Sequence, residues 1–224
     1  MKKILFLGRK HCENTSRIFR YLKKKTKKVQ VIYSSFPGES LNLKKIDKNY
    51  DYIFCFRSFY ILRKNILKRV NFAAINFHPG PPEYRGMGCV NYALYDEVKK
   101  YGCTAHIMGK HIDLGTIINV KRFAVKKKDT VNSVLKKTYK NMEIQAKKVI
   151  NLLIKDPTNL RKLINKSKKE KWSKKIYKKN NLDKFYEIKI NISKKDIIKK
   201  IRATNTEKFK PYLLIHNHKF IYSE

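Results

Sequence analysis

Three polar residues in the middle of the chain have side chains suited to acyl transfer. Asn76 and His78 lie two positions apart at the end of an apolar run that begins at Ala73, and a loop rich in proline and glycine follows them. Residues two apart in a strand point to the same side, so an amide and an imidazole can address one reacting atom. Asp113 completes the set if the fold brings it back, because a carboxylate orients an imidazole and stabilises its charged form.

The chemistry that these side chains could perform is the attack of an amine on a carbonyl group. The Asn76 amide would donate a hydrogen bond to the developing oxyanion, where one such donor is worth about 3 to 4 kcal/mol. His78 would assist proton transfer, and Asp113 would hold His78 or a bridging water and favour the protonated imidazole. An uncharged amine is already nucleophilic, so no covalent intermediate on the enzyme is required. From the residues alone, Asn76 and His78 can also simply cap the strand and bond the loop backbone.

Asn76 and His78 are expected at the end of a strand, and apolar patterns along the chain predict the sheet to which this strand belongs. They indicate strands at 3–7, about 29–33, about 52–56, 73–77, 103–108 and 116–125, and helices at 13–22, about 64–70, 90–98 and from a cap at Asp129 to about 154. Strands that alternate with helices predict an α/β, Rossmann-like, mainly parallel sheet with flanking helices. Ligands of such sheets bind beyond the carboxyl ends of the strands, where Gly8, Arg57 and His78 fall.

The sequence Asp156-Pro157 closes a predicted catalytic domain of residues 1–157. Residues 158–181 are expected to be a basic, Lys-rich connector with one tryptophan, Trp172, and little periodicity. Residues 182–224 predict a small α+β appendage that holds a short helix at 195–201 and a hairpin of 211–215 with 219–222.

The charge of the chain indicates anionic ligands without choosing among them. There are 54 Lys and Arg residues against 17 Asp and Glu, a formal net charge of +37. Such a field favours folates, nucleotide sugars or RNA. Lysine occurs in nearly every segment together with Asn, Ile, Tyr and Phe, whose codons are rich in A and T. Genomic base composition therefore explains the charge without a nucleic-acid partner.

Several other kinds of site have no signature in the sequence. There is no P-loop and no dinucleotide fingerprint. His106 and His111 near Cys103 hint at a metal ion, but the alternation over 103–108 favours a strand with mixed faces, and no metal is expected. Reduced thiols are expected at the four cysteines, which are Cys12, Cys55, Cys89 and Cys103. No apolar stretch approaches the twenty residues of a membrane span, so a soluble, cytoplasmic protein is expected.

The motifs around the polar residues resemble those of the folate-dependent formyltransferases, which include glycinamide ribonucleotide transformylase, methionyl-tRNA formyltransferase and the nucleotide-sugar N-formyltransferases. The resemblance rests on Asn76-Phe77-His78-Pro79, on Tyr84-Arg85-Gly86 in the following loop and on Asp113-Leu114-Gly115, in the family's order and spacing. It implies transfer of a formyl group from 10-formyltetrahydrofolate to an amine. Asn76, His78 and Asp113 are the catalytic residues that it implies.

The resemblance also suggests where the folate and the substrate bind. The pterin is expected between the loop after the third strand and the loop before Asp113, and the implied cofactor-binding residues are Tyr60, Leu62, Leu67, Met108, Gly109 and His111. The family often has a proline shortly after the Ile61-Leu62 pair, where this chain has Arg63-Lys64. The implied substrate-binding residues are Gly8, Arg9, Tyr84 and Arg85. Arg9 takes the place that helps to hold substrate phosphate in the purine-pathway relative, and a solvated turn is the alternative there.

Three amine acceptors compete under this resemblance. The glycinamide ribonucleotide enzyme normally ends soon after the long helix, which leaves 182–224 unexplained, and the methionyl-tRNA enzyme carries a longer C-terminal barrel. A nucleotide-linked amino sugar fits best, because the compact tail with Arg202-Ala203 resembles that of sugar N-formyltransferases. Those enzymes typically form homodimers and serve cell-surface glycan synthesis, such as that of O-antigen and lipopolysaccharide. A basic RNA-binding protein on the same scaffold is the non-enzymatic alternative, and the intact catalytic set argues against it.

Overall fold

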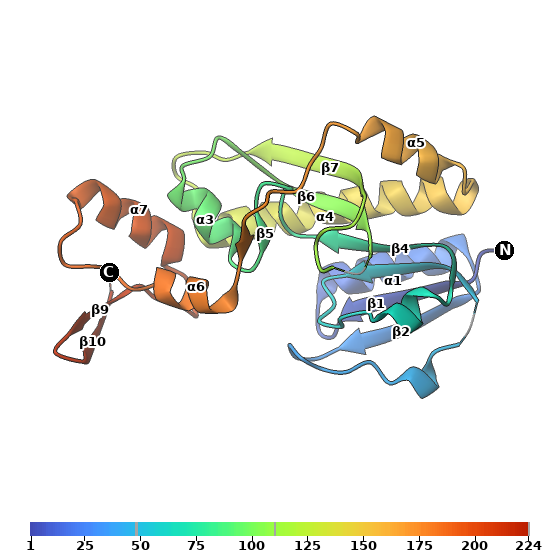
Figure 1. The fold of residues 1–224 in the computed structure, drawn as a ribbon, viewed down its shortest axis with the longest axis horizontal. Coiled ribbons are helices and arrows are strands. Elements are labelled where there is room, and N and C mark those ends of the chain that lie inside the picture. The colour runs from blue at the N-terminus through green and yellow to red at the C-terminus, as the bar shows by residue number, and fades with distance from the viewer. Residues whose placement is uncertain (48, 110, 224) are drawn as a thin grey trace.

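A six-stranded sheet forms the centre of the chain, of which the computed structural model describes residues 1–47, 49–109 and 111–223 (Figure 1). Its order is β2-β1-β3-β4-β6-β7, with β1 (Ile4–Arg9), β2 (Val29–Ser34), β3 (Tyr50–Phe56), β4 (Val70–His78), β6 (Lys100–Ile107) and β7 (Ile117–Ala124). The first four strands in this order run parallel, whereas β6 is antiparallel to both of its neighbours. The predicted mainly parallel sheet is confirmed.

The two faces of the sheet are covered unequally. Successive residues of a strand point to opposite faces, so Ile4 and Phe6 of β1 enter one apolar cluster and Leu5 and Leu7 enter another. The first cluster is closed by the long helices α1 (Glu13–Lys25) and α4 (Val131–Lys155). The second is covered by loops, the 3-10 turn η1 (Leu43–Lys45) and the short helix α2 (Lys64–Leu67). The thin cover leaves the carboxyl ends of β3 and β4 open to a ligand.

The long helix α4 begins one residue later than the sequence indicates. Thr130 is its N-cap, and Thr130 and Ser133 exchange hydrogen bonds in a capping box. Asp129, the predicted cap, instead accepts hydrogen bonds from the Lys126 amide and the Ser133 hydroxyl and pairs with Lys137 at 2.6 Å. Burial opposes its ionisation, but these donors outweigh burial and hold the pKa of Asp129 at about 2. The cap prediction for Asp129 is therefore wrong by one position.

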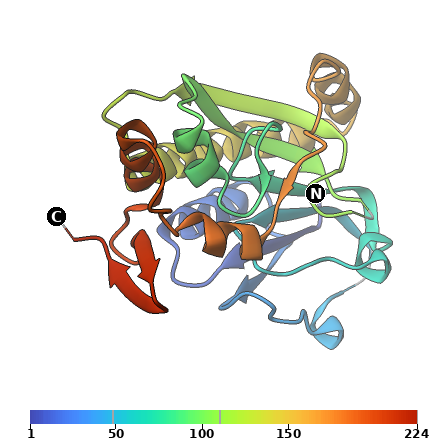
Figure 2. The same ribbon diagram turned by 60° about the vertical axis from the view of Figure 1, so that its left-hand side comes forward.

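The C-terminal part of the chain, after α4, begins with α5 (Asn159–Lys166), which lies beside α4 and β7. It continues with β8 (Ile176–Tyr177), α6 (Lys179–Phe185), α7 (Lys194–Thr204) and the predicted hairpin of β9 (Tyr212–Ile215) with β10 (His218–Ile221). α7 and the hairpin lie at the opposite end of the molecule from α5 (Figure 1 and Figure 2). α7 packs on α3 (Cys89–Tyr95), and β8 pairs with β5 (Arg85–Gly86). No helix in the described part of the chain has the length and apolar character needed to cross a bilayer.

The segment expected to be a connector has more regular structure than its sequence suggests. Leu160, Leu163 and Ile164 of α5 pack against the core cluster beneath α4, at the spacing of one helix face. The high lysine content of 158–181 masks this short stripe. Further along, Trp172 lies against the histidines of the sheet.

Candidate active site

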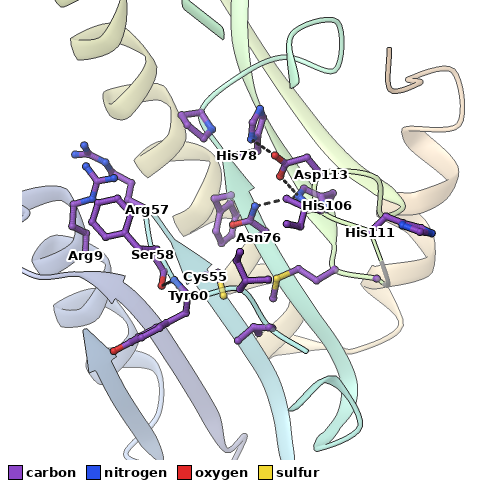
Figure 3. Close-up of a pocket in the computed structure, with 18 of the residues that line it drawn as sticks. Arg9, Cys55, Arg57, Ser58, Tyr60, Asn76, His78, His106, His111 and Asp113 are labelled. Atoms are coloured by element: carbon purple, nitrogen blue, oxygen red, sulfur yellow. Dashed lines mark hydrogen bonds and ion pairs between the residues drawn. The ribbon is translucent and has the colours of Figure 1, made fainter. Parts of the chain in front are cut away.

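The end of β4 brings Asn76 and His78 beside a third polar residue, His106. β6 pairs with β4 so that His106 faces Asn76 and Thr104 faces His78. The Asn76 amide nitrogen lies 3.2 Å from His106 Nε2, and His106 Nδ1 lies 3.2 Å from the Ile107 carbonyl oxygen (Figure 3). A carbonyl can only accept, so this network assigns the proton of His106 to Nδ1. Nε2 then accepts from the Asn76 amide and fixes its orientation.

Asp113 returns to this strand end, as the sequence analysis requires. Its carboxylate oxygens lie 3.5 Å from His78 Nδ1 and 3.6 Å from His106 Nε2, and its side chain is 12% exposed. The backbone of Asp113 has a φ of 50°, in the left-handed region that Asp and Asn tolerate better than most residues. Burial opposes the ionisation of Asp113, but its interactions with the imidazoles of His78 and His106 and with the charge of Arg85 outweigh burial and lower the pKa. The carboxylate is therefore ionised at neutral pH.

His78 is buried and neutral at neutral pH. Burial lowers the pKa of His78 by more than the Asp113 carboxylate raises it, so Asp113 favours the protonated imidazole, as expected, but does not keep it protonated in the resting site. Nε2 of His78 lies 3.3 Å from the Tyr84 carbonyl oxygen, to which it donates its proton in the assigned tautomer. Nδ1 then carries a lone pair and faces the carboxylate. This arrangement presents two hydrogen-bond acceptors side by side, which suits an amine.

Trp172 closes the site from the C-terminal side. Its ring stands edge to face against His78 and His106, with centroids 5.9 and 5.2 Å away. Its indole N–H donates to the Gly115 carbonyl at 2.7 Å and ties the segment after α5 to the loop that carries Asp113. From the sequence, Trp172 was expected only to be part of a connector. The one feature that could have indicated a role for it in the site is that it is the only tryptophan of the chain.

A cavity of about 300 Å³ opens in front of these side chains. Asn76, His78 and Asp113 form one wall of it (Figure 3). The other walls come from the segments 57–62, 108–109 and 111–112, where the folate is expected from the sequence, and from Arg9, Cys55 and Tyr139. The amide of Met108 donates to the Ala74 carbonyl at 2.7 Å and holds one of these walls to the sheet.

Most of the predicted cofactor-binding residues line this cavity. They are Tyr60, Leu62, Met108, Gly109 and His111. Leu67 does not line it, because its side chain packs against the apolar cluster beneath the sheet. The hydroxyl of Tyr60 points away from the cavity and lies 2.8 Å from the Tyr33 carbonyl oxygen and 3.0 Å from Glu39. Tyr60 therefore offers its ring rather than its hydroxyl.

Of the predicted substrate-binding residues, only Arg9 lines the cavity. Gly8 is buried against α1, and a Cβ there would lie 2.2 Å from Thr15 Cγ2, so packing explains the glycine. Tyr84 donates its hydroxyl to Asp96 at 2.7 Å, and Arg85 donates to the Ser173 carbonyl at 3.0 Å. These contacts fix the loop behind His78, and the predictions of substrate contacts by Gly8, Tyr84 and Arg85 are corrected accordingly.

The sequence did not indicate His106 as a residue of the site. It predicted a strand with mixed faces over 103–108 rather than a metal site, and Cys103 points into the core on the side of β6 opposite to His106. In the described residues, no group of three His, Cys, Asp or Glu side chains is arranged to hold a metal ion. The spacing of Thr104 and His106 carried a usable signal, since two polar residues two apart in an apolar strand mark a polar face.

The chain is similar to known proteins in both sequence and fold. Residues 40–146 match the family model described as formyl transferase. The bifunctional polymyxin resistance protein ArnA of Wigglesworthia glossinidia brevipalpis is 35% identical over 149 residues, which are 63% of this chain and 22% of that protein. The chain thus spans about a fifth of this curated relative.

Two solved structures share the fold over nearly the whole chain. A 4-N formyltransferase from Francisella tularensis has a TM-score of 0.71 at 20% identity, covering 99% of this chain and 97% of the other. An N-formyltransferase from Helicobacter canadensis, in complex with folinic acid and dTDP-3-aminofucose, has a TM-score of 0.70 at 17% identity, covering 98% and 86%. Residues 40–146 of this chain therefore match the formyl transferase family model, and the chain shares the overall fold of these N-formyltransferases.

Proposed function

We propose that this chain is an N-formyltransferase that moves a formyl group from 10-formyltetrahydrofolate to the amine of a nucleotide-linked amino sugar. The observation that carries the proposal is the convergence of Asn76, His78 and Asp113 on one wall of a cavity. The formyl transferase match over 40–146 supports the reaction class. The folinic acid and aminofucose nucleotide bound by the Helicobacter canadensis protein support the two substrates.

The cavity fits a folate ring. Its walls combine apolar side chains, such as Phe59, Leu62 and Met108, with polar groups that can orient a ligand, as is usual for small-molecule sites. Among the described residues, no hydrogen bond engages the backbone of Ile61 or Leu62. These backbone groups border the cavity and are free to bond the edge of a flat heterocycle. Ile61 and Ile112 expose their side chains at the same cavity and extend its apolar surface outward.

Each side chain of the site has its own role in the proposed transfer of the formyl group. When bound, 10-formyltetrahydrofolate supplies the formyl carbon, and its N10 leaves with a proton that the amine has given up. Asp113 and the lone pair on His78 Nδ1 accept the N–H groups of the incoming amine and orient its lone pair. Asn76 donates its second amide hydrogen to the formyl oxygen, because the first is taken by His106. His78 accepts the amine proton at Nδ1 and returns it to the leaving nitrogen.

Asp113 stabilises the imidazolium that forms during this step. The carboxylate lies 3.5 Å from the nitrogen that gains the proton. Trp172 covers the two histidines and keeps water from competing for the same proton. The neutral resting state of His78 makes it a proton acceptor first and a donor second, in the order that the reaction needs.

The proposal is tested by incubating the purified chain with 10-formyltetrahydrofolate and a panel of dTDP-, UDP- and GDP-linked amino sugars. Mass spectrometry of the nucleotide sugar should show the gain of one formyl group with at least one member. His78→Ala should abolish the gain, and His216→Ala is the matched control because His216 is exposed in the hairpin turn. No formylated product with any member of the panel, or equal product from the His78 variant, would contradict the proposal.

A further inference from the structure

A segment after α5 passes beside the site and carries Trp172. We call residues 170–177 the strap, which runs from α5 past the strands of the sheet toward α6 (Figure 1). The Ser173 amide donates to the Pro82 carbonyl at 3.0 Å, and β8 at the end of the strap pairs with β5. Trp172 donates to the Gly115 carbonyl. The strap is therefore attached both to the loop after His78 and to the loop of Asp113.

The charge of this part of the chain opposes its attachment. Glu170 is the only acidic residue between Asp156 and Asp183, whereas lysine and arginine recur throughout that stretch. The whole chain carries a net charge of +37, so a lysine-rich segment is repelled by the surface on which it lies. Glu170 is therefore the position at which the strap can gain an attraction to a cation.

Arg122 supplies that cation from β7, at the edge of the sheet. Its Nη1 and Nη2 lie 2.5 and 2.8 Å from the two carboxylate oxygens of Glu170, which is a bidentate pair. Nη2 also lies 2.7 Å from a carboxylate oxygen of Glu83. We call Arg122 with Glu83 and Glu170 the clasp. Among the described residues, the clasp contains the only ion pair that the strap makes.

Both glutamates of the clasp lie next to residues that contact His78. Tyr84 follows Glu83, and its carbonyl oxygen lies 3.3 Å from His78 Nε2. Trp172 lies two residues after Glu170, and its ring stands against that of His78 with the centroids 5.9 Å apart. The clasp thus joins the segment that fixes the tautomer of His78 to the segment that covers its ring.

We propose that Arg122 is a positioning residue for His78, which acts by holding the strap to the loop after β4. The reaction of His78 rests on the proposed function, whereas the clasp itself does not. Arginine suits this role because its planar guanidinium can bond two carboxylates at once, which the ammonium of lysine does less well. Arg122 does not line the cavity of the site, so its loss can reach His78 only through the strap and the loop.

The fluorescence of Trp172 tests the clasp without turnover, because Trp172 is the only tryptophan of the chain. Quenching by acrylamide measures how accessible the indole is to solvent. Arg122→Gln removes the charge and keeps most of the length of the side chain. Glu170→Arg places a second cation against Arg122. Arg122→Glu combined with Glu170→Arg restores an opposite pair with the charges exchanged.

Arg17→Gln is the matched control. Arg17 also bridges two glutamates, Glu13 and Glu143, and its side chain is 35% exposed, against 33% for Arg122. It lies on α1 and pairs with α4, so the same charge and the same kind of contact are lost away from the strap.

We expect Arg122→Gln to raise the acrylamide quenching constant of Trp172 by at least about twofold, since ion pairs of this exposure have small but measurable effects. Glu170→Arg should raise it further, the double variant should return it toward the value of the unaltered chain, and Arg17→Gln should leave it unchanged. With a nucleotide sugar that is formylated, Arg122→Gln should lower kcat about 3- to 10-fold. The KM for that sugar should stay constant, because the cavity is untouched.

Two results would overturn the inference. One is an equal quenching constant in the unaltered chain and in Arg122→Gln, or no recovery in the double variant. The other is a quenching constant that follows the charges while kcat with a formylated sugar does not change. If no amino sugar is formylated, the proposed function fails and the quenching series alone decides the clasp. Each variant is measured well below its thermal unfolding midpoint, so that quenching reports on folded protein.

Discussion

Replacement of Asp113 by asparagine removes one charge from the centre of the site and changes little else. Asparagine has the same shape and also tolerates the left-handed conformation seen at this position, where φ is 50°. The carboxylate lies 3.5 Å from His78 Nδ1. At an effective dielectric constant of about 20, two unit charges about 4 Å apart interact by about 4 kcal/mol. Since about 1.4 kcal/mol corresponds to a tenfold change in rate, kcat/KM should fall by about a hundredfold to a thousandfold.

The pH dependence supplies a second readout of the same variant. Burial lowers the pKa of His78, and the Asp113 charge opposes that effect. Activity of the unaltered enzyme should therefore be lost as the pH falls through a value below 6.5, where His78 becomes protonated. Without Asp113, the pKa of His78 falls further, so the acid limb of kcat/KM should move to lower pH while the plateau drops. A variant within tenfold of the parent rate, with its acid limb unmoved, would refute the roles given to both residues.

Three further predictions follow from the geometry. Asn76→Ala should lower kcat by at least about 100-fold with little change in folate affinity, because the amide hydrogen that His106 does not accept stabilises the developing oxyanion; steady-state rates and folinic acid titration decide this. Trp172→Ala should lower kcat more than Trp172→Phe, since the smaller side chain uncovers His78, and unchanged rates in both variants would exclude a covering role. Gly8→Ala should destabilise the fold by about 1 to 3 kcal/mol in urea unfolding, and Thr15→Ser should restore much of that loss by removing the methyl group 2.2 Å from the new Cβ.

The sheet could be predicted from sequence because its strands are short apolar runs with strong local signals. Residues such as Phe54 and Ile75 are fully buried and had to be apolar wherever the neighbouring strands lay. The convergence of Asn76, His78 and Asp113 was also predictable, because Asn76 and His78 share a strand and the loop of Asp113 follows at the spacing typical of formyltransferases. Sequence patterns were less accurate at the ends of helices and strands. At the start of α4, for example, the adjacent residues Asp129 and Thr130 can each accept a hydrogen bond.

The remaining parts of the site depend on contacts between distant segments. His106 gains its role only through the register of β6 against β4. Trp172 lies in a lysine-rich stretch whose path across the sheet no local pattern reveals.

The indole of Trp172 links the segment after α5 to the loop that carries Asp113, beside the rings of His78 and His106. The segment that bears it also receives a hydrogen bond from Arg85 at the Ser173 carbonyl. A protein that ends at residue 157 would keep Asn76, His78 and Asp113 but would lose the aromatic ring that packs against both imidazoles. The proposed site therefore extends beyond the residues that match the formyl transferase model, and a shortened variant made for an assay has to include Trp172.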